Sequence, residues 1–173
     1  SGPGSPPDRQ HGQGERTSAG PEVRRVTLLT GDRVDLFSAD GRKAAIRPAP
    51  GRTGMKFITQ RIDDHLYVVP ADALPLVRSG RLDRRLFDVL GLVRAGYDDA
   101  RTTSLPLLVR YASPGTRKAP ALRAEGVTTK RRVPSIAGAS VRVAKDHAAE
   151  AWPRLRRAEG VERYWLNGKR RVL

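Results

Sequence analysis

Few side chains in this chain have the chemistry of a catalytic group, since it holds three histidines and no cysteine. Ser-His-Asp catalysis requires a histidine held between a nucleophile and a carboxylate. His11 lies in a stretch rich in glycine and proline, His65 follows two aspartates in an expected turn, and His147 falls in the first turn of an expected helix. Histidines at such positions are usually solvated, and the three share no short metal-ligand spacing. We therefore expect no catalytic residue, metal ion or cofactor.

Two pairs of adjacent aspartates are the remaining candidates for acid–base chemistry. Asp63 and Asp64 form one pair, and Asp98 and Asp99 form the other. Adjacent carboxylates in polar turns usually face solvent or stabilise the loop. No glycine-rich phosphate loop stands between an expected strand and helix. The absence of cysteine excludes thiol nucleophiles, disulfide scaffolds and zinc ribbons. The sequence favours a protein that is not an enzyme.

Positive charge is the strongest chemical signal in the sequence. The 173 residues include 33 Lys and Arg against 18 Asp and Glu, a formal net charge of +15. Residues 105–173 hold 16 of the basic and five of the acidic residues, so this half alone carries +11. Such a surplus favours a negatively charged partner. Lys130-Arg131-Arg132 and Lys169-Arg170-Arg171 are candidate phosphate contacts, although charge runs of this kind are more often solvated.

A membrane is not among the expected partners. The longest stretch without a charged residue, 133–141, is far shorter than the roughly 18 apolar residues of a membrane span. The first residues lack the charged end and apolar core of a signal peptide. This fits a cytosolic protein or one whose signal has been removed.

Composition divides the first part of the chain into a leader and a β-rich subdomain. Nine of the first 21 residues are Gly or Pro, so we expect residues 1–21 to be disordered. Short apolar runs separated by Gly-Asp and Asp-Gly turns then predict a small meander of four or five strands within 22–104. The expected strands are 26–30, 34–37, 44–47, 55–62 and 66–69.

Helical spacing of apolar residues follows the expected meander. Residues 73–79 and 82–89 predict two short helices, with Gly80 and Gly91 as their stops. The second of these segments also fits a buried strand.

Residues 105–168 follow the order strand, helix, strand, strand, helix, strand. This order predicts a split βαβ, ferredoxin-like domain, and we expect the whole chain to be of the α+β class. Asp146 is the expected N-cap of the last helix, and Pro153 requires that helix to start late or to kink. The expected strands are 105–111, 127–133, 139–145 and 161–166, and the expected helices are 116–125 and a helix that starts at Asp146.

One face of the expected strand 139–145 is polar, because Ser140 and Arg142 alternate with two valines. Ferredoxin-like sheets that bind RNA stack bases on aromatic residues of their central strands, and this strand has none. Tyr111 and Tyr164 are candidate stacking platforms, although packing in the core or at its rim is the stronger interpretation of both. A basic nucleic-acid-binding module is the alternative function.

Four segments resemble the propeptide region of secreted subtilisin-like serine proteases of actinobacteria such as Streptomyces. The resemblance extends from about residue 22 to the end, and the Gly-Arg-Leu-Asp-Arg-Arg-Leu-Phe-Asp-Val run is its most specific part. The segments are VTLLTGDRV (26–34), YVVPADA (67–73), SGRLDRRLFDV (79–89) and LPLLVRY (105–111).

This resemblance implies a function and a partner. Such propeptides are intramolecular chaperones and temporary inhibitors of their own protease, so the implied partner is the cognate protease domain of a secreted precursor. The sheet would pack against surface helices of the protease, and we place Ser140, Arg142 and Tyr164 on the protease-facing side. The tail 169–173 would extend into the substrate cleft, with Leu173 as the product (P1) residue. The tail residues are Lys169, Arg170, Arg171, Val172 and Leu173.

Residues 22–104 are additional to the minimal propeptide of that family. They could brace the inhibitory domain 105–168, extend its interface with the protease, or bind another part of the precursor. Their apolar patterning favours a stabilising subdomain.

Overall fold

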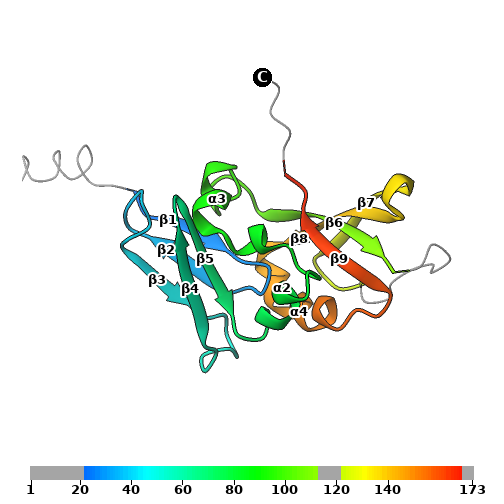
Figure 1. Cartoon of the computed structure of the whole chain (residues 1–173), viewed down its shortest axis with the longest axis horizontal. Helices are drawn as coiled ribbons and strands as arrows, with labels where there is room; N and C mark the ends of the chain where they lie inside the picture. The colour runs from blue at the N-terminus through cyan, green and yellow to red at the C-terminus, as the bar shows by residue number, and fades with distance from the viewer. Residues whose placement is uncertain (1–21, 113–121, 169–173) are drawn as a thin grey trace, which may run out of the picture.

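The computed structural model of the chain describes residues 22–112 and 122–168 (Figure 1). These residues form antiparallel sheets with a few short helices, so the fold is of the α+β class. The expected leader 1–21 and tail 169–173 lie outside the described residues, as does most of the expected helix 116–125.

The first part of the chain contains two small sheets. Three antiparallel strands form the first sheet, in the order β1-β2-β3, and two form the second. Gly31, at φ +88°, makes the turn between β1 and β2, where the Gly-Asp signal predicted it. The strands are β1 (Arg24–Thr27), β2 (Arg33–Leu36), β3 (Ala44–Arg47), β4 (Phe57–Ile62) and β5 (His65–Pro70).

The expectation of a single meander is therefore wrong. β3 and β4 do not pair, and the segment between them contains Pro48 and Pro50. Proline has no N–H to donate to a neighbouring strand, so the ladder stops after β3. The chain starts a separate hairpin at β4.

Three short helices follow the hairpin of β4 and β5, and the last two of them pack against β5. They are α2 (Leu74–Arg78), the 3-10 helix η1 (Arg84–Phe87) and α3 (Val89–Arg94). The segment 82–89 is thus not one helix, and Gly91 lies inside α3 instead of ending it. Asp88 explains the break: its backbone is extended, and its side chain accepts the N–H of Gly91 at 3.1 Å as the N-cap of α3.

A four-stranded antiparallel sheet occupies the second part of the chain, in the order β7-β8-β6-β9. Each of its strands falls where the sequence predicted one. Helix α4 lies against one face of this sheet (Figure 1). The elements are β6 (Ser104–Tyr111), β7 (Val127–Val133), β8 (Gly138–Ala144), α4 (Ala148–Arg156) and β9 (Val161–Leu166).

Helix α4 starts without the expected cap. Asp146 lies in a 3-10 turn, η4 (Lys145–His147), and its carboxylate contacts His147, so the prediction of an Asp146 N-cap is wrong. The 3-10 turn leads directly into the helix. Pro153 lies inside α4, where its missing N–H removes one helical hydrogen bond.

Buried apolar side chains from both parts form one continuous cluster. Val26 and Leu86 of the first part and Leu105, Val141 and Trp152 of the second all belong to it. The two predicted subdomains therefore share a core. None of the helices in the described ranges is long and apolar enough to span a membrane.

Candidate functional site

The two faces of the four-stranded sheet differ sharply in burial. Leu107 of β6 pairs with Val141 of β8, and Val109 pairs with Ala139; all four side chains are fully buried. Because side chains alternate along a strand, this buried face is the one that α4 covers (Figure 1). Leu105 and Val143 share this buried face, and the residues that alternate with these six point to the opposite side.

We call the opposite side the open face. Ser140 lies there, half-buried and paired with Leu108, and Arg142 is exposed. The two residues share one face, as the sequence predicted. The open face comprises Leu108, Arg110, Ser140, Arg142, Arg163 and Trp165.

Tyr164 does not lie on the open face, so its predicted place beside Ser140 is wrong. Its side chain is 1% exposed, and its hydroxyl donates to the carbonyl oxygen of Leu155 in α4 at 2.9 Å. Tyr164 pairs with the buried Val109, which fixes it on the helix side. Burial also raises its pKa above the ordinary range of a tyrosine.

An aromatic residue that the sequence analysis did not select, Trp165, lies on the open face. The guanidinium carbons of Arg110 and Arg163 each lie 5.0 Å from its ring centre. Arg110 also forms an ion pair with Glu162. The open face thus presents a half-buried indole between two cations.

The outer edge of β9 is covered by a segment from the first part of the chain. Leu82 forms a parallel bridge with Tyr164, whose N–H donates to the carbonyl oxygen of Arg81 at 2.8 Å. The N–H of Asp83 donates to the carbonyl oxygen of Tyr164 at 3.0 Å. Residues 81–83 therefore act as a fifth strand beside β9.

The last described residues of β9 are held on several sides. The N–H of Asn167 donates to the carbonyl oxygen of Pro106 at 2.9 Å, and the Tyr97 hydroxyl donates to the carbonyl oxygen of Asn167 at 3.3 Å. The predicted cleft-binding tail, 169–173, starts two residues later and lies outside the described residues. These contacts fix Asn167, two positions before the tail in the sequence.

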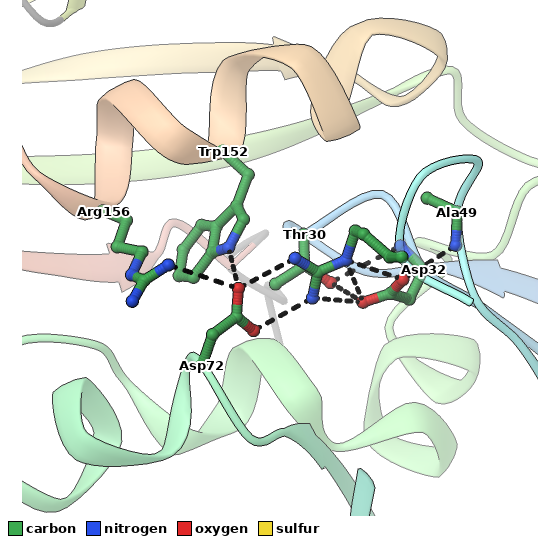
Figure 2. Close-up of polar contacts among 7 residues, drawn as sticks. Thr30, Asp32, Ala49, Asp72, Trp152 and Arg156 are labelled. Atoms are coloured by element: carbon green, nitrogen blue, oxygen red, sulfur yellow. Dashed lines mark hydrogen bonds and ion pairs between the residues drawn. The ribbon is translucent and has the colours of Figure 1, made fainter. Parts of the chain in front are cut away.

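A buried network of charges connects the first part of the chain to α4 (Figure 2). Arg52 lies between two carboxylates: it donates to both oxygens of Asp32 at 2.8 to 3.1 Å and to both oxygens of Asp72 at 2.8 and 2.9 Å. The indole N–H of Trp152 donates to Asp72 at 2.8 Å, and Arg156 lies 3.7 Å from the same oxygen. Bidentate hydrogen bonds thus hold Asp72 within the first part, and the Trp152 hydrogen bond and the Arg156 ion pair join it to the second.

The network stabilises the charged form of its members. Burial alone would raise the pKa of Asp72, but hydrogen bonds from Arg52 and Trp152 outweigh it, so its pKa lies below the usual value near 3.8. The hydrogen bond to Asp72 also raises the pKa of Arg52. Asp72 and Arg52 are therefore both ionised near neutral pH.

The two aspartate pairs serve different purposes. Asp99 accepts hydrogen bonds from the N–H and hydroxyl of Thr27 at 2.9 and 2.6 Å and pairs with Lys145 at 2.8 Å. Asp98 is fully buried. This pair stabilises its loop, as expected, with Asp98 buried and Asp99 partly exposed. Asp64 is largely exposed in the turn between β4 and β5.

Both described histidines lie beside carboxylates. The Nδ1 atom of His65 is 2.7 Å from Asp88, and that of His147 is 3.0 Å from Asp146. The hydrogen bond with Asp146 raises the pKa of His147. His147 also forms a group with the exposed Glu125 and Glu150 whose ligand atoms lie within 4.8 Å of one another, a set that could hold a divalent cation.

Three features escaped the sequence analysis. The three-residue spacing of His147 and Glu150 at a helix start could have been noticed, because it places both on one helical face. Arg52 and Asp72 gave no local signal, since each finds its partners 20 or more residues away. Trp165 could have been assigned to the open face only with knowledge of its pairing to Leu108.

Comparisons with known proteins add no identity to this geometry. No protein-family model, no curated protein and no solved structure matches the chain significantly.

Proposed function

We propose that this protein is the propeptide of a secreted subtilisin-like serine protease, acting as its intramolecular chaperone and temporary inhibitor. The observation that carries the proposal is the course of β9. This strand borders the open face, and only Asn167 and Gly168 separate its end from 169–173 in the sequence. A partner that docks on the open face is therefore adjacent to the start of the tail.

The strand order supports the ferredoxin-like assignment of 105–168. In a split βαβ arrangement the first and third strands are central, and the second and fourth are at the edges. The order β7-β8-β6-β9 has this form, and α4 connects the third strand to the fourth. The first connecting helix is expected at 116–125; residues 116–121 of it lie outside the described residues, and 122–125 form no α-helix.

The proposed mechanism uses the open face and the tail in separate roles. Ser140, Arg142 and their neighbours dock on the protease surface, and the tail adds as an extended strand to the edges of the substrate cleft. Leu173 then enters the primary specificity pocket. The net charge of +11 on residues 105–173 speeds association with an acidic protease surface.

Residues 22–104 support this mechanism as a brace. The segment 81–83 covers the edge of β9, and Tyr97 holds the carbonyl oxygen of Asn167. These contacts hold β9 and Asn167 in place, close in sequence to the start of the tail. This extra part of the chain thereby preorganises the inhibitor, which raises affinity by reducing the ordering cost of binding.

The deciding experiment measures inhibition of a purified actinobacterial subtilisin, ideally the cognate enzyme, by the chain with and without 169–173. We expect competitive inhibition by the full chain and a loss of at least about 100-fold in affinity on deletion, since the tail fills the cleft. Circular dichroism of both forms controls for folding. A folded full chain that leaves the cognate protease fully active would refute the inhibitor function.

Nucleic-acid binding is the second candidate, and Trp165 between two arginines on a basic face is the observation that favours it. The central strands β6 and β8 carry Leu108 and Ser140 where RNA-binding sheets of this kind carry aromatics. Binding to a single-stranded oligonucleotide that weakens steeply with salt and survives deletion of 169–173 would favour this candidate instead.

A further inference from the structure

Three arginines converge at one edge of the open face. Arg110 and Arg163 come from neighbouring strands, and Arg81 comes from the segment that covers β9. All three line a pocket of about 390 Å³ together with Ser79, Gly80 and Glu162. The pocket is thus built jointly by the two parts of the chain.

The charges in this pocket do not balance. Three guanidinium groups face a single carboxylate, that of Glu162, which pairs with Arg110. Arg81 uses one terminal nitrogen to donate to the carbonyl oxygen of Ala158. A carbonyl oxygen carries no full charge, so this bond leaves the charge of Arg81 uncompensated. The positive charges of Arg81 and Arg163 lie in one small pocket, which is unfavourable without a negative charge beside them.

The hydrogen-bond inventory points in the same direction. The Nε atoms of Arg81, Arg110 and Arg163 are buried, and none of them has a hydrogen-bond partner among the described residues. Guanidinium groups bind carboxylates and phosphates through the edge formed by Nε and a terminal nitrogen. An anion with two or more oxygens would supply the acceptors that these three groups lack.

Two of the arginines are held in place before any ligand arrives. Arg110 and Arg163 both stack on Trp165, and this limits the rotations that a free arginine would lose on binding. The backbone of Arg81 is fixed by its bond to the N–H of Tyr164. The site is therefore preorganised.

The geometry points to an oxyanion-binding site formed by Arg81, Arg110 and Arg163, whose ligand is a carboxylate or a phosphate. The site stands independently of the propeptide function. Its identification as the receptor for an acidic side chain of the protease rests on that proposed function. A free inorganic anion is the other source of the same chemistry.

The first test titrates the full chain with inorganic phosphate at constant ionic strength and follows tryptophan fluorescence. The chain has two tryptophans; Trp152 belongs to α4 and is buried in the core, so Trp165 reports on the site. We expect a saturable change that disappears in Trp165→Phe. Arg163→Gln should weaken binding about tenfold, while the exposed Arg154→Gln on α4 should change it less than about twofold.

A second variant keeps the test decisive if an arginine variant fails to fold. Glu162→Gln removes the carboxylate that competes for Arg110, so phosphate should bind several times more tightly. A linear fluorescence change, or equal phosphate affinities in Arg163→Gln, Glu162→Gln and Arg154→Gln, would overturn the site.

Inhibition assays with the protease distinguish the two sources of the anion, an acidic side chain of the protease and a free anion. If an acidic side chain of the protease occupies the site, Arg163→Gln should raise the inhibition constant at least about fivefold, and phosphate should compete with the protease. Unchanged inhibition by Arg163→Gln would assign the site to a free anion. A chain that does not inhibit at all would refute the propeptide function and leave the phosphate titration intact.

Discussion

The two parts of the chain use their arginines in opposite ways. In 22–104, five aspartates are buried, and arginines or a histidine pair with them. Among the described residues of 105–168, Lys145 is the single buried charged residue. Its side chain forms an ion pair with Asp99 of the first part. The arginines of the second part stand mainly on its surface. The charges of the first part thus stabilise its own fold, whereas those of the second part lie mainly on its surface.

Removal of Arg52 should break this arrangement most severely. Arg52→Met leaves Asp32 and Asp72 facing each other without the cation between them, and loss of one member of a buried ion pair costs about 3 to 5 kcal/mol. Chemical denaturation monitored by circular dichroism measures the loss. The matched variant Arg154→Met should stay within about 0.5 kcal/mol of the wild type; similar losses in the two would contradict the role of the network.

The contact between the first hairpin and α4 should be almost as sensitive. Gly31 has φ +88°, and a Cβ atom there would lie 2.5 Å from the Cβ of Ala149. Gly31→Ala therefore combines backbone strain with a clash, and we expect a loss of about 2 to 3 kcal/mol. Gly51 also has a positive φ but open space around it, so Gly51→Ala serves as the control and should cost only about 1 kcal/mol. Equal losses would mean that the hairpin does not press on α4.

Acid should weaken the connection between the two parts. The pKa of Asp72 is lower in the folded chain than its usual value, so its contribution is complete above about pH 4 and disappears as the pH falls through the lowered pKa. The free energy of unfolding should fall between pH 5 and pH 2, by roughly 1 kcal/mol less in Asp72→Asn than in the wild type. Urea denaturation of both proteins across this range measures how their free energies of unfolding depend on pH. Parallel dependences would show that Asp72 does not contribute to the loss of stability in acid.

The open face should respond least in stability and most in binding. Arg142 is exposed and donates to Ser104 at 3.2 Å, so Arg142→Ala should change the free energy of unfolding by less than about 0.5 kcal/mol. Its affinity for the protease should nevertheless fall severalfold. If Arg142→Ala instead lowered stability strongly and left inhibition unchanged, the charges of the second part would serve the fold and not binding.

Local patterns predicted the strands well where a strand is a run of alternating or buried apolar residues, as in β5, β6 and β8. The pairing of the strands was harder to predict from the sequence. The separation of β3 from β4 depends on Pro48 and Pro50, whose effect is to withhold donors from a ladder. The break before α3 depends on Asp88, whose side chain accepts the N–H of Gly91 and so starts a new helix there. The spacing of apolar residues alone does not reveal this cap.

The error at Tyr164 has a definite physical origin. The register between β6 and β9 shifts at Arg110 and Tyr111, so one extra residue of β9 lies between the partners of these two. Such a bulge changes which side chains face the core. Val161 and Tyr164, three residues apart, are consequently both buried, which simple alternation does not allow.

The segment beside β9 also has a consequence for solubility. An uncovered edge strand offers free N–H and carbonyl groups to any other extended chain. At β7 the run Lys130-Arg131-Arg132 is exposed, and its charges oppose such pairing. Around Tyr164 the backbone is instead satisfied by 81–83. A shortened protein that began at residue 105 would lose this cover, and we expect it to self-associate through β9.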